Sequence, residues 1–212
     1  QKRPVPSFEP ARLEVPQERV LVENREIAQS NLALGLRALS RTDPDRYALL
    51  ILNSILGRGM SSRLFKEVRE RRGLAYSVGS AVSRYFDTGL LVINAGVAPQ
   101  NLKEAVRVIV EELGKLVDEP VSAEELTKVR DYAVGSFRLS LETPMALGQR
   151  AGELLLTMGE IEPIESVVEK LRAVTPDDIL RVARRIIQGA KPTLAVVGPG
   201  ADGEDLAGLL DN

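Results

Sequence analysis

One continuous stretch, Gly57–Ser77 (GRGMSSRLFKEVRERRGLAYS), constrains the fold of this chain more than any other part of the sequence. Two glycines at its start permit backbone angles that other residues resist, and a serine at position 61 or 62 can cap a helix. An apolar stripe follows, and a glycine suits the position just past the helix end. The stretch therefore predicts a glycine turn, a helix from about Ser62 to Arg72, and the entry to a strand.

The strand expected next, Leu74–Arg84, has two different faces. One face carries Leu74, Tyr76, Val78 and Val82, and the other carries small residues: Ala75, Ser77, Gly79, Ala81 and Ser83. A face with so little bulk suits a strand that another backbone or a ligand approaches closely. It suits a sheet face covered tightly by a helix equally well. Among its apolar neighbours, Tyr76 is expected in the core with its hydroxyl at the rim.

The remaining pattern alternates hairpins with helices. Arg19–Ile27 and Ser30–Leu39 are expected to pair as a hairpin or meander, and Leu90–Val97 to pair with Leu74–Arg84. Asp43 and Pro44 are expected to open a helix that is buried nearly all round over Tyr47–Leu56. From Pro99 onward the sequence predicts helices over Asn101–Val117, Ser122–Leu141 (with a capping box to Glu125), Thr143–Gly159, Pro163–Ala173 and Thr175–Gln188, then a strand over Thr193–Val197 and a glycine-rich acidic tail from Gly198.

This order favours an α+β fold: a two-layer domain with a mainly antiparallel sheet covered by helices. We expect a single domain over residues 17–212, preceded by a proline-rich linker over residues 1–16. A chain that opens on a linker, and with Gln rather than Met, is expected to continue an upstream segment.

Composition excludes several kinds of chemistry. The sequence has no His and no Cys, which rules out imidazole-dependent triads, thiol nucleophiles and zinc sites built on these residues, HExxH and HxxEH included. A net charge of -2 makes nucleic acid an unexpected partner. Without an apolar run of about 18 residues or a signal peptide, we expect no membrane partner and a cytoplasmic location.

Other candidate motifs have ordinary explanations. The GRGMSS segment suggests a phosphate loop, but it lacks the GK[ST] ending. The run KEVRERR is most simply a solvated helix face with Glu67 and Arg71 as an i,i+4 pair. The sharper interpretation places Arg69 in a functional cleft. Adjacent glutamates such as Glu111 and Glu112 diverge on a helix, so they are poor paired carboxylates.

The segments SSRLFKEVRERRGLAYSV and YFDTGLLVINAGV resemble the second half of the insulinase, pitrilysin and mitochondrial processing peptidase family of zinc metallopeptidases. Gln29, the buried helix ending in ILGRGM, and the helix VTPDDILRVARRII fall in the same order as in that family. The resemblance implies a protease assembled from two halves of similar α+β fold around a substrate chamber. It also implies that the first half carries HxxEH and the zinc.

For this chain the resemblance implies specific site residues. The helix Tyr47–Leu56 takes the place of the HxxEH helix but is apolar apart from Asn53 and its neighbour Ser54, so we expect no metal ligand and no catalytic residue in this chain alone. Arg69 and Tyr76 have the family's seven-residue spacing and are expected to bind substrate. The family's glycine-rich loop is represented only by Gly57–Gly59, which makes compact bacterial relatives the better match.

Two hypotheses follow. The first is the non-catalytic, substrate-binding half of a two-part zinc peptidase, inactive alone, with zinc in an HxxEH-bearing half that lies upstream in the same polypeptide or on a separate chain. Its partners would be that half and a peptide substrate, and a homo-oligomer is possible. The second is a purely structural member, like the core proteins of respiratory complexes. The presence of Arg69 and Tyr76 favours the first.

Overall fold

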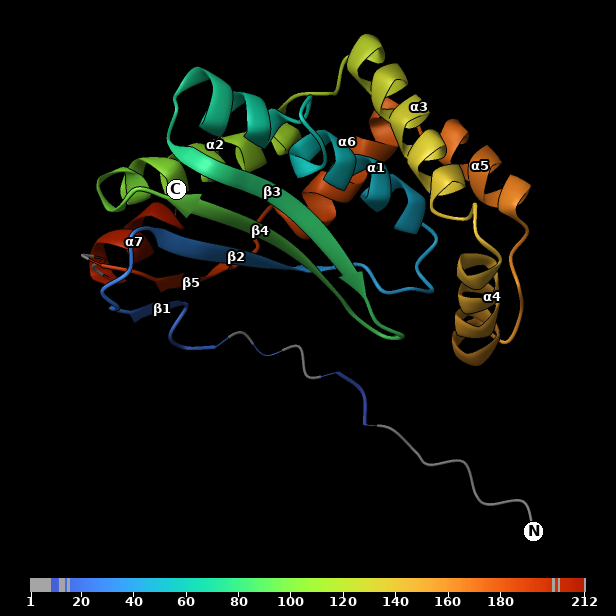
Figure 1. Cartoon of the computed structure of the whole chain (residues 1–212), viewed down its shortest axis with the longest axis horizontal. Coiled ribbons are helices and arrows are strands. Elements are labelled where there is room, and N and C mark those ends of the chain that lie inside the picture. The colour runs from blue at the N-terminus through green and yellow to red at the C-terminus, as the bar shows by residue number, and fades with distance from the viewer. Residues whose placement is uncertain (1–8, 12–13, 15, 200, 202, 212) are drawn as a thin grey trace.

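The computed structural model describes residues 9–11, 14, 16–199, 201 and 203–211. A layer of helices covers one face of a twisted sheet (Figure 1). The elements run in the order β1 (Val20–Glu23), β2 (Ser30–Ala38), α1 (Arg46–Gly57), η1 (Phe65–Arg71), β3 (Ala75–Arg84), β4 (Gly89–Val97), η2 (Pro99–Asn101), α2 (Leu102–Asp118), α3 (Ala123–Leu139), α4 (Pro144–Met158), α5 (Ile164–Ala173), α6 (Pro176–Ile186), β5 (Thr193–Val197) and α7 (Gly203–Leu209).

The sheet has the strand order β1-β5-β2-β4-β3, with β3 at one edge. β2 pairs antiparallel with both β4 and β5, β3 pairs antiparallel with β4, and β1 pairs parallel with β5. The α+β fold with a mainly antiparallel sheet is thus confirmed. The expected pairing of β1 with β2 is wrong, because β5 lies between them. Alternation within a strand decides which face is buried, but not which strand becomes its neighbour.

The core forms where the helix layer meets the sheet. Leu34 pairs with Ile93 across the central strands, and both side chains are fully buried. Ten of the twelve residues of α1 are buried above them, which confirms a helix buried nearly all round. The expected helix start is wrong, since the N-cap is Asp45 and its side chain makes no capping bond. Asp43 Oδ1 instead accepts from Asp45 N at 2.9 Å, which closes a turn before the helix.

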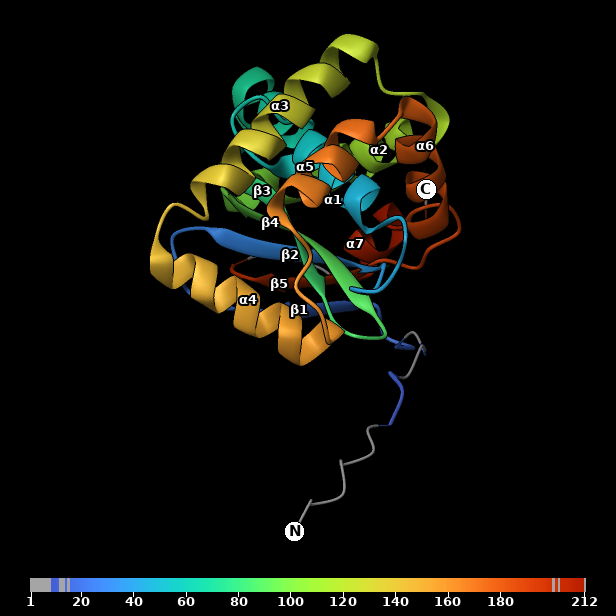
Figure 2. The ribbon, with the colours of Figure 1, turned by 90° about the vertical axis from the view of Figure 1, so that its right-hand side faces the viewer.

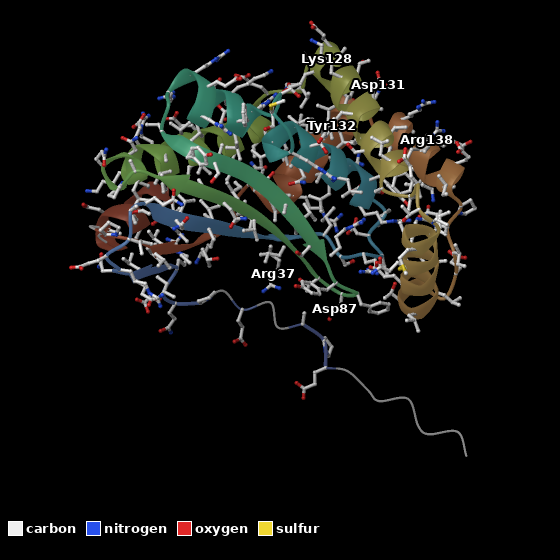
Figure 3. All side chains as sticks on the ribbon, in the orientation of Figure 1. Arg37, Asp87, Lys128, Asp131, Tyr132 and Arg138 are labelled. Atoms are coloured by element: carbon white, nitrogen blue, oxygen red, sulfur yellow. The ribbon has the colours of Figure 1, made fainter. Side chains whose placement is uncertain are left out.

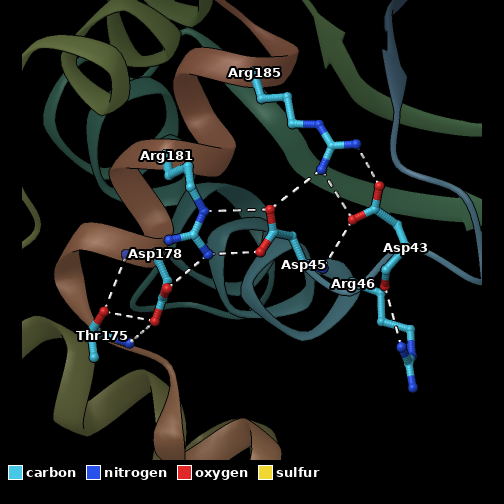
Figure 4. Close-up of polar contacts among 7 residues, drawn as sticks. All are labelled: Asp43, Asp45, Arg46, Thr175, Asp178, Arg181 and Arg185. Carbon is cyan, nitrogen blue, oxygen red and sulfur yellow. Dashed lines mark hydrogen bonds and ion pairs between the residues drawn. The ribbon is translucent and has the colours of Figure 1, made fainter.

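A charged network joins the start of α1 to α6 (Figure 4). Arg181 contacts Asp45 at 2.7 Å, and Arg185 contacts Asp43 at 2.6 Å. The first turn of α6 holds a complete capping box, in which Thr175 Oγ1 accepts from Asp178 N and Thr175 N donates to Asp178 Oδ2. The network fixes α6 against α1 at the rim of the core.

The opposite face of the sheet is different in character. Its side chains include Ala33, Gly79, Ala81, Asn94 and Gly96, which are small or polar. In the described part of the chain no helix covers this face (Figure 1). The alternative of a tight helix cover over the small-residue face of β3 is therefore wrong, and the approach of a ligand to this face stays a prediction.

The two ends of the chain differ in how much of them the structure describes. The glycine-rich acidic tail beyond Gly198, for which no element was predicted, contains α7, whose Leu206 is fully buried. Most of the proline-rich linker, residues 1–16, lies outside the described residues, so the division at residue 16 stays a prediction. Within the described ranges, every helix is too short or too polar to cross a lipid bilayer.

Candidate functional site

The helix between the glycine turn and β3 is a π-helix rather than the expected α-helix, and it runs from Phe65 to Arg71. Gly73 follows with φ of 61°, which confirms a glycine just past the helix end. Ser62 does not cap the helix with its side chain, because Ser62 Oγ donates to the carbonyl of Gly59 at 2.7 Å. π-Helical turns occur often at functional sites, so this one marks the segment for closer inspection.

Two ion pairs hold the π-helix against neighbouring helices. Arg63 donates two hydrogen bonds to the Glu125 carboxylate, at 3.0 and 2.8 Å, and these bonds raise the pKa of the Arg63 guanidinium. Arg72 pairs with Glu104 of α2 at 3.0 Å. Glu125 thereby leaves its expected capping box half complete, since Ser122 Oγ still accepts from Glu125 N. These two ion pairs lie at the two ends of the π-helix, and Arg69 between them is exposed.

A β-bulge sets the direction of Tyr76. Ala75 pairs with Val97 and Ser77 with Gly96, so Tyr76 is the extra residue that has no partner on β4. The expectation of a core tyrosine is wrong, because Tyr76 is 81% exposed. The extra residue interrupts the alternation on which that expectation rested. Bulges commonly re-aim a side chain beside an active site.

Arg69 and Tyr76 lie side by side, as the seven-residue spacing requires for a shared site. The Arg69 guanidinium carbon is 5.5 Å from the centroid of the Tyr76 ring and 5.0 Å from that of Phe65. In the part of the chain that the structure describes, neither the Arg69 guanidinium nor the Tyr76 hydroxyl makes a hydrogen bond or ion pair. The pair is thus preorganised by ring contacts while its polar atoms remain available.

Sequence reasoning missed Phe65 as a member of this cluster. It was assigned to the apolar stripe, yet its half-buried ring contacts Arg69 one helical turn away. The i,i+4 spacing of an aromatic and an arginine was the available signal.

A shallow groove of about 410 Å³ lies on the uncovered sheet face near this cluster, lined by residues such as Asn31, Gly79 and Asn94. Gly96 keeps the groove open, because a Cβ there would lie 3.1 Å from Gln29 Nε2 and 3.2 Å from Ser77 Oγ. Backbone and small polar groups therefore line the surface next to Tyr76, which suits contact with an extended chain.

The turn before the π-helix is packed rather than open. A Cβ on Gly57 would lie 2.5 Å from Ser80 N, so glycine is required there for close approach. Gly59 has φ of 91°, and a Cβ there would lie 3.4 Å from the ring of Tyr132. Tyr132 belongs to α3 and is labelled in Figure 3. These contacts favour a structural turn over a phosphate loop.

The helix α1 cannot hold zinc. Its two buried polar side chains are already bonded: Asn53 accepts a hydrogen bond from Ser80 Oγ at 2.7 Å, and Ser54 Oγ donates to the carbonyl of Leu50 at 2.9 Å. Among the described residues there is no group of three or more acidic side chains that could hold a metal ion, and the sequence has neither His nor Cys. The residues present do not fit a zinc site.

The described residues thus form a two-layer α+β domain that holds no cluster of metal ligands and exposes an arginine and a tyrosine side by side. The family model described as the peptidase M16 inactive domain matches residues 1–132. The chain belongs to this family, which confirms the resemblance to zinc metallopeptidases.

Relatives and solved structures agree with that assignment. An uncharacterized zinc protease of Streptomyces coelicolor is 39% identical over 184 residues, which cover 87% of this chain and 40% of the relative. The zinc protease YmxG of Bacillus subtilis is 34% identical, over 86% of this chain and 44% of the relative. A crystal structure of a peptidase M16 inactive domain from Pseudomonas fluorescens has a TM-score of 0.81 at 21% identity, covering 93% of this chain and 48% of that one. The chain thus spans less than half the length of these proteins.

Proposed function

We propose that this chain is the substrate-binding, non-catalytic half of a two-part zinc endopeptidase and closes the chamber opposite an HxxEH-bearing half. The family, the relatives named as zinc proteases and their roughly doubled length support this proposal. Zinc would belong to the other half, which lies upstream in the same polypeptide or on a separate chain. The chain alone would be inactive, and its proposed location is the cytoplasm.

The observation that carries the proposal is the exposed pair of Arg69 and Tyr76, stacked at 5.5 Å with free polar atoms. Folding alone gives no reason to expose a tyrosine ring at an edge strand beside a cation. A guanidinium can donate to the carbonyl groups of a bound peptide backbone. A phenol hydroxyl can donate to the oxyanion of the tetrahedral intermediate, an effect of order 10²-fold or more in rate.

The roles of the two residues would differ. Arg69 would bind substrate and transition state equally well, because the peptide carbonyls that it contacts are not the reacting one and do not change their charge during the reaction. Tyr76 would act on the charge that develops at the scissile carbonyl oxygen, and so would favour the transition state over the bound substrate. Bound zinc in the other half would supply the polarised water.

Reconstitution tests the proposal. The HxxEH half is purified by itself, and hydrolysis of a fluorogenic peptide library is measured with and without this chain. We expect hydrolysis only when both are present, with zinc recovered in the HxxEH half and none in this chain after dialysis against a weak chelator. An HxxEH half that is fully active without this chain would contradict the proposal and favour a purely structural role.

A further inference from the structure

A second cavity lies at the other end of β3. It measures about 640 Å³ and is lined by α1, α3, α4, α5 and the segment before α5. Arg84 from the last position of β3 lines it, eight residues from Tyr76 and thus roughly 26 Å along the strand. Figure 2 shows α4 standing apart from the helix layer beside this region. The cavity is separate from the Arg69 and Tyr76 pair.

Positive charge is in excess around the cavity. Six cationic side chains line it against three acidic ones, and the cationic ones are Arg41, Arg46, Arg58, Arg84, Arg150 and Lys170. Glu153 pairs with Arg41 at 2.8 Å. Glu162 accepts hydrogen bonds from Lys170 and Tyr47 and lies 3.6 Å from Arg46. Two of the acidic groups are therefore already paired within the wall.

Arg84 differs from Arg41, Arg46, Arg150 and Lys170, each of which has a polar partner, and from Arg58, which is exposed. Within the described residues its guanidinium makes no hydrogen bond or ion pair, although its backbone carbonyl accepts from Arg41 at 3.4 Å. Burial, followed by the charge of Arg41, holds the pKa of the Arg84 guanidinium below its usual value. A half-buried cation next to two other cations is costly unless an anion accompanies it.

The rest of the wall is apolar. Leu50 of α1, Phe137 of α3, Leu154 of α4 and Leu171 of α5 all line the cavity. Ligand pockets are generally lined by apolar side chains, and a few convergent polar groups fix the orientation of the ligand. An inorganic anion would leave most of this wall without contact.

We propose that this cavity binds an organic anion in which a single carboxylate, held by Arg84, is attached to an apolar body. Two sources share that chemistry: a free amphiphilic acid and the C-terminal residue of a peptide ending in an apolar side chain. The cavity size suits a body of several carbon atoms rather than a long chain. The inference does not depend on the proposed peptidase role, because it uses none of the same residues.

Calorimetric titration tests the inference. Octanoate and N-acetyl-phenylalanyl-leucine are titrated separately into the 212-residue chain at millimolar concentrations, with 1-octanol and the peptide amide as uncharged counterparts. We expect one or both acids to bind at least about tenfold more tightly than their counterparts. Preference for octanoate identifies a free amphiphile, and preference for the peptide identifies a C-terminal residue. Failure of both acids to bind overturns the inference.

Two variants with opposite expected effects on affinity test the position of the site. Arg84→Met keeps length while removing charge, and should weaken binding about tenfold or more without lowering the thermal midpoint of the free protein. Glu153→Gln releases Arg41 and should tighten binding severalfold. Arg172→Gln, a charge change on the exposed side of α5, serves as the matched control and should leave binding unchanged. Unaltered binding in Arg84→Met, or an equal loss in Arg172→Gln, overturns the assignment.

Discussion

Helix α1 and the segment from Phe65 to Tyr76 are neighbours with opposite designs. In α1 ten of twelve residues are buried, and the polar Asn53 is satisfied by Ser80. In the other segment an arginine and a tyrosine face solvent against each other, with ring contacts but no polar partner in the described part of the chain. The requirements of folding explain α1 completely, whereas they leave the exposed pair unexplained.

This difference separates the residues that stabilise the fold from the residues that are exposed and available for binding. Helix α1 is almost entirely core, so its side chains contribute to stability. The adjacent π-helix and β-bulge interrupt the regular backbone hydrogen-bond pattern, and in doing so they change the direction in which side chains point. Substitutions in the two regions should therefore separate cleanly into effects on stability and effects on activity.

The largest expected effect on stability is that of Leu52→Ala in α1. Leu52 is fully buried, and removing a buried leucine leaves a cavity that costs about 2–5 kcal/mol. Tyr76→Ala removes a larger side chain but one that is 81% exposed, and should cost about 0.5 kcal/mol or less. Urea denaturation of both variants measures the difference. Equal losses would erase the contrast between the regions.

Next in size is Gly57→Val, at the junction of the two regions. The new side chain would meet Ser80 N within 2.5 Å, and overpacking of this kind costs roughly 1–3 kcal/mol. Gly59→Val should also destabilise, because valine is strained at φ of 91°. Arg58→Ala is the matched control from the same turn. Identical denaturation midpoints for all three variants would show that neither glycine is required.

A smaller effect should depend on pH. The hydrogen bonds that Thr175 donates hold the pKa of Asp178 below its ordinary value of 3.8. A carboxyl group whose pKa is lowered by folding stabilises the protein above its unfolded pKa, and that stabilisation is lost as the pH falls through the folded pKa. Asp178→Ala should thus cost about 1 kcal/mol at pH 7 and progressively less as the pH falls below 3.8.

Asp177→Ala is the control for this titration, since Asp177 is exposed and adjacent in the same helical turn. Denaturation midpoints measured across the acid range report the comparison. A cost for Asp178→Ala that stays constant with pH would show that the ionised carboxylate does not contribute through the capping box.

Much of the fold was predictable because local patterns determined it. The apolar run of α1 and the glycine just past the helix before β3 each specify their structure within a few residues, and both were confirmed. The partner of β1 was not predictable, because β5 lies about 170 residues further along the chain. The helix α7 was missed, because glycine and acidic residues surround Leu206, its buried leucine.

The site was half predictable. Spacing and resemblance selected Arg69 and Tyr76, and the structure brings them together. The exposure of Tyr76 was beyond sequence reasoning, because a strict alternation hides a bulge. The π-helical geometry was equally hidden, since nothing in KEVRERR distinguishes it from a solvated α-helix.

The most direct test of the central claim is steady-state kinetics of Tyr76→Phe in the reconstituted two-half enzyme. Removing one hydroxyl should lower kcat and kcat/KM together by about 10²-fold, with KM, zinc content and the denaturation midpoint little changed. Arg69→Ala should mainly raise KM, and Arg71→Ala, whose guanidinium is paired with Glu67 at 2.6 Å, serves as the control. Wild-type turnover by Tyr76→Phe would contradict the claim that this exposed pair completes a peptidase site.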